Sequence, residues 1–264
     1  MSKGLLDPKV DFVFKNIFGS PNHPEILISF LNATLKAKKK IVNVDIKKTD
    51  IEKQYIEDKY SRLDVKATTS NDEIINIEIQ LKNENNMVKR SLYYLSKMYE
   101  EQLNEKEDYS KLVRTVCINI LNFKYLKTDN FHTGYRFKEI ESNEELTDIM
   151  EVHFIEIPKL QDSSDEKDML VAWTEFLKDP ESEKVRGLEL SIEEIRQAKD
   201  ELIRMSNDST QRELYDMRAN SLRDKMSELN AAERKGIEKG REEGREEGRK
   251  EEKIKIARNM KLSG

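Results

Sequence analysis

Apolar residues near the start of the chain recur at helical spacing, and further on they alternate with polar residues at the spacing of strands. After Pro8 the apolar residues stand three or four positions apart, which predicts a helix that ends at Gly19. A second helix is predicted after Pro24, because proline is well tolerated in the first turn. Stretches in which apolar and polar residues alternate then predict strands over 42–46, 63–67 and 75–81.

The middle of the chain returns to helical spacing and then enters a run of β-branched residues. A helix is predicted over 87–104, with a buried stripe formed by Val88, Leu92, Leu95, Tyr99 and Leu103. The run 112–121 predicts a fully buried central strand. Strands over 135–140 and 152–157 and a helix over 165–178 follow. Because helices and strands mix along the chain, we expect an α/β fold with a mixed central sheet flanked by helices.

The last third of the chain is more polar and predicts a helical extension. We expect the mixed domain to span 1–186 and a helical region, which packs on the core or on a second copy, to span 187–230. Ser191 and Glu194 have the spacing of a capping box and predict a helix start. The tail 231–264 is charged and has glycine at every fourth position from 236 to 248. Each interior glycine costs about 1 kcal/mol relative to alanine, so we expect a frayed helix at most, or disorder.

The composition excludes several kinds of site. The chain has one cysteine and three histidines, so zinc sites of the cysteine–histidine type, disulfide frameworks and iron–sulfur clusters are excluded. A metal site must use mainly carboxylates, which favours Mg²⁺ or Mn²⁺. No G-x-G-x-x-G or P-loop motif occurs in the sequence, so we expect no nucleotide cofactor.

Charge and hydropathy limit the binding partners and the cellular location that we expect for this protein. The formal net charge of −5 argues against general electrostatic attraction to DNA or membranes, although it is compatible with a local basic surface. No apolar run is long enough for a membrane span or a signal peptide, so we expect a cytoplasmic protein that does not bind membranes. Cys117 lies in the buried run 112–121, where an inert thiol is expected.

A pair of acidic residues stands out in the segment that contains the second and third predicted strands. A turn centred on Asn71 would place Asp64 directly opposite Glu78, with Lys66, Gln80 and Lys82 on the same face. Opposed carboxylates repel each other, and a cation between them removes that penalty. The alternative is an ordinary polar outer face of a hairpin, in which Lys66 offsets the charge.

The helix that follows this hairpin adds basic and aromatic residues. With the buried stripe placed as above, Lys89, Arg90, Tyr94 and Lys97 lie off the stripe and form a surface next to the acidic pair. A surface of this kind suits a phosphate beside a divalent ion, so we expect these four residues to bind DNA.

Three segments in this order resemble the Rpn family of recombination-promoting nucleases, also described as transposases of the PD-(D/E)XK type. They read DPKVDFVFKNIFG, SRLDVKATTSNDEIINIEIQLKNENNMVKRSLYYLSKMY and EKGREEGREEGRKEEKIKIAR. The resemblance is strong over 5–125 and only compositional in the tail. It implies a PD-(D/E)XK restriction-endonuclease-like core and a Mg²⁺-dependent DNA endonuclease linked to recombination or mobile elements.

The resemblance also implies roles for individual residues. Asp64 and Glu78 would be metal ligands, and the backbone carbonyl of Ile79 could complete the shell. Gln80 stands where such nucleases usually have lysine, and it can hold a water molecule but carries no charge. Lys66 or Lys82 could supply that charge.

Two further questions stay open at the level of sequence. Asp11, on the first predicted helix, is a candidate third acid, and the alternative is a surface pair with Lys15. The leading function is DNA cleavage by a homodimer, since cutting both strands of a duplex needs two active sites or two binding events. The alternative is a catalytically weak or inactive protein that uses the nuclease fold to bind DNA or another protein.

Overall fold

A computed structural model describes residues 4–37, 39–47, 65–165 and 167–262. The chain divides into two compact units, Met1–Tyr215 and Asp216–Gly264. In chain order the helices and strands are α1 (Asp11–Phe18), α2 (Pro24–Leu35), β1 (Val44–Lys47), β2 (Val65–Thr69), β3 (Ile74–Gln80), α3 (Met87–Glu100), η2 (Tyr109–Lys111), β4 (Thr115–Leu121), β5 (His132–Lys138), β6 (Glu145–Glu156), η3 (Ile157–Lys159), α4 (Met169–Lys178), α5 (Glu183–Glu189), α6 (Glu193–Asn207) and α7 (Ser209–Leu262).

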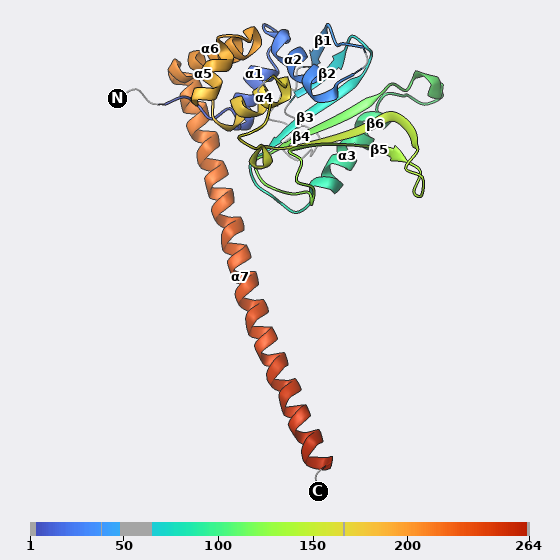
Figure 1. Cartoon of the computed structure of the whole chain (residues 1–264), viewed down its shortest axis with the longest axis vertical. Helices are drawn as coiled ribbons and strands as arrows, with labels where there is room; N and C mark the ends of the chain where they lie inside the picture. The colour runs from blue at the N-terminus through green and yellow to red at the C-terminus, as the bar shows by residue number, and fades with distance from the viewer. Residues whose placement is uncertain (1–3, 38, 48–64, 166, 263–264) are drawn as a thin grey trace. The chain divides into compact units, whose positions relative to one another are not determined.

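The first unit is built on a six-stranded sheet in the order β1-β2-β3-β4-β6-β5 (Figure 1). The pairs β3/β4 and β4/β6 are parallel, whereas the outer pairs are antiparallel. All seven residues of β4 are buried, as the run of β-branched residues predicts for a central strand. The prediction of an α/β fold with a mixed sheet is confirmed.

The hairpin of β2 and β3 has the predicted register. Val65 lies opposite Ile77 and Thr68 lies opposite Ile74, so the turn falls between Thr69 and Glu73. Asp72 adopts a left-handed conformation in this turn, with φ 60°, which aspartate tolerates better than most residues. Asp64 lies outside the described residues, so its predicted position opposite Glu78 stays a prediction.

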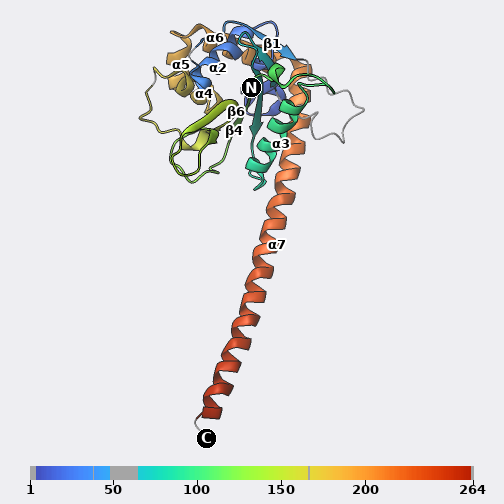
Figure 2. The ribbon, with the colours of Figure 1, turned by 90° about the vertical axis from the view of Figure 1, so that its right-hand side faces the viewer.

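Helices cover both faces of the sheet. Helix α3 lies on one side and α1, α2 and α4 lie on the other (Figures 1 and 2). Between α1, α2 and α4, Phe18 stacks on Phe14 with ring centroids 4.5 Å apart and meets the edges of Phe30 and Trp173 at 5.4 and 5.3 Å. These rings bury a large apolar area and hold the helices on their side of the sheet.

Helix α6 belongs to the core of the first unit. Its apolar side chains Ile195, Leu202 and Met205 are fully buried, and it contacts both α1 and α2. The helical region was expected to pack either on the core or on a second copy of the chain, and α6 packs on the core. The predicted capping box is wrong, because α6 begins after Ile192 without a side-chain cap and the Ser191 hydroxyl donates to the Leu188 carbonyl instead.

Helix α3 is rotated relative to the predicted stripe. Val88 and Leu92 are 41% and 49% exposed, whereas Ser91 and Tyr94 are buried. The β3 face toward α3 carries Asn76 and Glu78, and the helix places Arg90 where its Nε donates to the Glu78 carboxylate. Leu95 of the predicted stripe is buried, together with Met87 and Met98.

The tail forms a continuous helix to Leu262, which is the helical one of the two alternatives, and the expected fraying of this helix stays a prediction. None of the glycines at 236, 240, 244 and 248 has a positive φ, and the residues between them are mostly glutamate, arginine and lysine, which favour helix. Pairs such as Lys239 and Glu243, 3.7 Å apart, add to the helix at i, i+4 spacing.

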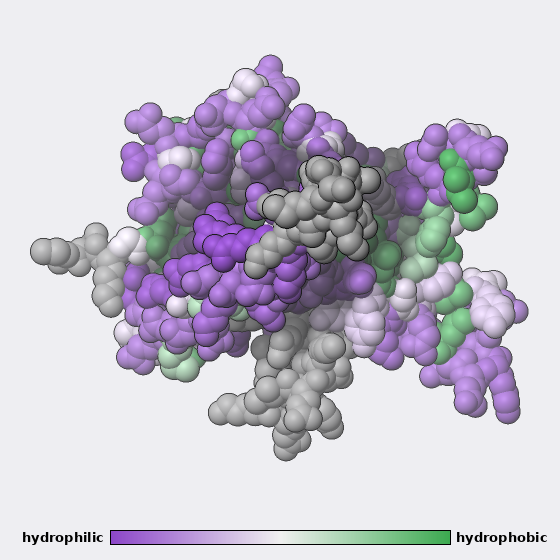
Figure 3. All heavy atoms as spheres, turned by 90° about the horizontal axis from the view of Figure 1, so that it is seen from below, coloured by the Kyte–Doolittle hydropathy of each residue, from purple (hydrophilic) through white to green (hydrophobic). Residues whose placement is uncertain are grey.

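The surface is mostly hydrophilic on the face that Figure 3 shows. Its hydrophobic residues gather toward the right-hand side, where Figure 1 places the ends of β5 and β6. Exposed apolar side chains of this hairpin are Phe137, Ile140 and Leu146. Every helix within the described ranges is too short or too polar to cross a membrane.

Candidate active site around Glu78

Glu78 lies in the middle of the sheet and is almost completely buried. Its side chain is 1% exposed, and it stands beside Asn119 in the parallel pair of β3 and β4. Because side chains alternate along a strand, Asn76 and Glu78 share the face toward α3 while Ile77 turns to the opposite face. Lys66 of β2, directly opposite Asn76, lies on this same face.

The Glu78 carboxylate is paired with an arginine from α3. Arg90 Nε donates to Glu78 Oε2 at 3.2 Å. Burial raises the pKa of Glu78, and the positive charge of Arg90 only partly opposes that shift. A carboxylate whose charged form is disfavoured by burial is stabilised by any further cation that reaches it.

Several buried polar atoms beside this pair are unsatisfied. Within the described part of the chain, Glu78 Oε1 and both polar atoms of the Asn76 side chain have no hydrogen-bond partner. Orphaned buried oxygens and nitrogens are costly, so a ligand or ordered water that bonds to them is favoured. The oxygen-rich donor set fits a hard divalent cation. Sequence reasoning missed Asn76, although a lone amide two positions before Glu78 in an apolar strand is a readable signal.

The floor of the site is a hydrogen-bonded polar layer. The Ser91 hydroxyl of α3 donates to the Asn119 side-chain oxygen at 2.9 Å, and the Asn119 amide donates to the His153 carbonyl at 3.1 Å. Cys117 is fully buried next to this layer, and burial, reinforced by the negative charge of Glu78, raises its pKa to about 12. A thiol with so high a pKa is unreactive at neutral pH, which agrees with the expected inert thiol.

The lysines expected to add charge lie near the site but interact with other groups as well. Lys66 is half-buried, with its Nζ 3.9 Å from Glu101 Oε2, and burial lowers its pKa while Glu101 opposes that shift. Gln80 is the last residue of β3 and is half-buried, and Lys82 follows in the next loop. The Ile79 side chain, between Glu78 and Gln80, is buried.

The predicted DNA-binding surface on α3 is only partly a surface. Lys89 is exposed, and Lys97 lies 3.3 and 3.5 Å from Glu100 and Glu101. Tyr94 is buried, so its assignment to an exposed DNA-binding surface is wrong, because the helix turns this ring toward the sheet.

Asp11 begins α1 and is half-buried. Its carboxylate accepts a hydrogen bond from the Phe12 amide at 2.7 Å. A carboxylate in the first turn of a helix is stabilised locally by the helix dipole, whatever else it binds. Its role as a third acid therefore stays a prediction.

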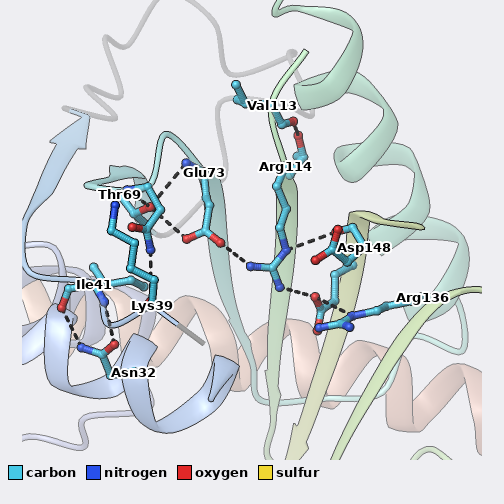
Figure 4. Close-up of polar contacts among 12 residues, drawn as sticks. Asn32, Lys39, Ile41, Thr69, Glu73, Val113, Arg114, Arg136 and Asp148 are labelled. Atoms are coloured by element: carbon cyan, nitrogen blue, oxygen red, sulfur yellow. Dashed lines mark hydrogen bonds and ion pairs between the residues drawn. The ribbon is translucent and has the colours of Figure 1, made fainter. Parts of the chain in front are cut away.

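A second cluster of polar side chains lies apart from Glu78 and centres on Arg114, directly before β4. Arg114 pairs with Glu73 and Glu151, and its Nε donates to the Asp148 carbonyl at 3.2 Å (Figure 4). Arg136 Nε lies 3.0 Å from Glu151. Burial alone would raise the pKa of Glu151, but its hydrogen-bond partners outweigh burial and lower this pKa to about 2. These buried pairs fasten strand ends together and were not visible in the sequence pattern.

No group of three or more histidine, cysteine, aspartate or glutamate side chains arranged for a metal ion occurs among the described residues. Asp64, the predicted partner of Glu78, lies outside that part of the chain.

Comparison with known proteins gives one family. The model of a family described as PD-(D/E)XK nuclease family transposase matches residues 8–232. No curated protein and no solved structure gives a significant match. The matched range contains the whole sheet, Glu78 and helix α6.

Proposed function

Because this chain belongs to the PD-(D/E)XK nuclease family transposases, we propose that it is a metal-dependent DNA endonuclease that acts in recombination or on mobile elements. The observation that carries the proposal is the buried Glu78 carboxylate, which has one unsatisfied oxygen and lies beside an unsatisfied amide, Asn76, at the centre of the sheet. Such a group gains more from a bound cation than an exposed carboxylate does, since the interaction is less screened by water.

The ion in this proposal is Mg²⁺ or Mn²⁺, held by Glu78, Asp64 and the backbone carbonyl of Ile79. When bound, such an ion withdraws charge from the phosphate and makes a water molecule more acidic. The donor set is all oxygen, which matches the preference of both ions.

The protein's own side chains hold the water and the phosphate. Gln80, at the end of β3, accepts and donates hydrogen bonds and orients a water molecule without taking its proton. The water oxygen forms a bond to phosphorus, and the bond from phosphorus to one deoxyribose oxygen breaks. The attacking water loses a proton and the leaving oxygen gains one. Lys89 and Lys97 on α3 contact neighbouring phosphates of the DNA, with Lys66 and Lys82 as further sources of charge.

The test is cleavage of supercoiled plasmid with Mg²⁺, compared with the same reaction in EDTA. Asp64→Ala and Glu78→Gln should each abolish nicking, because the loss of one carboxylate leaves the ion with too few ligands. The matched control is Glu175→Gln, since Glu175 is also a buried glutamate paired with a cation, Lys184 at 3.1 Å, but lies on α4. This control should cut plasmid at the wild-type rate.

The alternative function is binding of DNA or protein without catalysis. It is favoured by the pairing of Arg90 with Glu78, since an arginine can neutralise a buried carboxylate where no metal binds. Plasmid that stays intact in both Mg²⁺ and Mn²⁺, together with DNA binding that EDTA does not change, would support this alternative. Wild-type nicking by a folded Glu78→Gln protein would contradict the assignment of the site.

A further inference from the structure

Arg90 contacts Glu78 through only one of its three nitrogens. The bond runs from Nε, and within the described residues the two terminal nitrogens make no hydrogen bond. The Arg90 side chain is 21% exposed whereas that of Glu78 is 1% exposed, so Arg90 reaches from the buried carboxylate toward solvent. A guanidinium has five N–H donors in a fixed plane, so the described residues use only one of the donors of Arg90.

The arginine is held in place by the helix that carries it. Its guanidinium carbon lies 5.4 Å from the centre of the Tyr94 ring, one turn along α3. Tyr94 is buried against the sheet, so the cation–π contact and the ion pair fix Arg90 from two directions. A preorganised cation loses little side-chain entropy when it binds a ligand.

Arg90 can also supply the positive charge that is missing because Gln80 stands where such nucleases usually have lysine. Lys66 lies near Glu101, and Lys97 near Glu100 and Glu101, at the far end of α3. Among the cations in the described ranges, Arg90 is the one that forms an ion pair with Glu78. An arginine suits a phosphate better than a lysine does, because its planar fork can bind two oxygens at once.

We infer that Arg90 is the phosphate-binding cation of this site, which holds the Glu78 carboxylate through Nε and the non-bridging oxygens of the cleaved phosphate through its terminal nitrogens. The inference rests on the proposed function and names the group that replaces the charge missing at Gln80. Arg90 thereby couples a metal ligand to the substrate, and it stabilises the negative charge that builds up on the phosphate during displacement.

This role has an unusual consequence for metal binding. Arg90 and a divalent ion neutralise the same buried carboxylate, so they compete for its charge. Replacing Arg90 with alanine should leave the affinity for Mn²⁺ unchanged or raise it, although cleavage falls. A purely structural arginine would give a different result, since a misplaced Glu78 would weaken the metal and slow cleavage together.

The experiment compares the full chain with Arg90→Ala and Arg90→Lys. Single-turnover nicking of plasmid in Mg²⁺ should fall by about 100-fold in Arg90→Ala, the usual loss for one donor to a developing oxyanion, and by less in Arg90→Lys. Guanidinium ion added at millimolar concentration should restore part of the Arg90→Ala rate and none of the Glu78→Gln rate. Mn²⁺ affinity without DNA is measured by titration calorimetry, and binding of a short duplex in Ca²⁺ is measured by fluorescence anisotropy.

Arg136→Ala is the matched control, because Arg136 is also half-buried and paired with a buried glutamate, Glu151. Arg136→Ala should lower the thermal stability of the protein. Its affinity for Mn²⁺ should equal that of the wild type, and added guanidinium should not change its rate of nicking. The inference is overturned if Arg90→Ala nicks at the wild-type rate, or if it loses Mn²⁺ affinity and is not rescued. A wild-type protein that never cleaves overturns the proposed function, and this inference with it. Wild-type cleavage with an unaffected Arg90→Ala overturns this inference alone.

Discussion

His132 couples folding stability to pH through its half-buried ring. Its Nε2 lies 2.9 Å from Nδ1 of His153, and the rings stack. Burial, helped by His153 and Lys36, lowers the pKa of His132 to about 4, whereas Asp168 and Glu151 oppose the shift. The folded protein therefore keeps this ring neutral at pH values where the unfolded chain protonates it.

The sign of the effect follows from the depressed pKa. The stability that the neutral ring contributes is complete above pH 6.5, the ordinary histidine value, and is lost as the pH falls toward about 4. His132→Gln cannot gain a proton, so its free energy of unfolding should fall less steeply over this window. Urea unfolding at several pH values measures the free energy of unfolding of both proteins. The same dependence of this free energy on pH in the variant and the wild type would contradict the prediction.

At the scale of elements, the glycine-spaced tail offers a direct test of helix propensity. An added Cβ at Gly240 or Gly244 meets no atom within 4 Å, so alanine fits at both positions. The double variant Gly240→Ala, Gly244→Ala should stabilise this part of α7 by about 2 kcal/mol, because each glycine costs about 1 kcal/mol relative to alanine.

Hydrogen exchange of the tail amides in the full chain measures this gain, which should appear as slower exchange. Gly187→Ala is the control, since an added Cβ there also meets no atom within 4 Å but Gly187 lies in α5. Unchanged tail exchange in the double variant would mean that something other than local helix propensity sets the stability of the tail.

At the scale of the whole molecule, the open question is how the chain associates. Because the apolar side of α6 is buried on α1 and α2, α6 cannot also carry a dimer interface on that side. The next apolar positions on α7 include Met217, which is 67% exposed. Helices with an uncovered apolar stripe commonly pair with a second copy.

We predict that the full chain is a dimer and that truncation after Tyr215 gives a monomer. Truncation after Ala232 should leave the dimer intact, because the residues beyond it offer mostly charged side chains and little apolar area. Light scattering measures the mass of each protein. The monomer should nick plasmid more readily than it linearises it, since one active site cuts one strand at a time. A protein that stays dimeric without residues 216–264 would place the interface in the first unit.

Much of the first unit could be read from the spacing of apolar residues. Helical spacing before Gly19 and alternation around Ile75 and Ile77 predict α1 and β3 because side-chain direction follows from the local backbone. The hairpin register was predictable for the same reason, since one turn position sets every pair between β2 and β3.

The tertiary structure decided which side of α3 faces the sheet and which polar groups meet there. Apolar periodicity placed Val88 and Leu92 inward, but Met87, Leu95 and Met98 are the apolar residues of α3 that are buried, and Arg90 pairs with Glu78 on β3. Arg114 likewise meets Glu73 and Glu151 only because three strands bring them together. The sequence pattern shows where apolar side chains recur along the chain. The cost of burying a charged side chain depends on whether it has a partner, and such partners are distant in the sequence. Only the folded sheet brings them together.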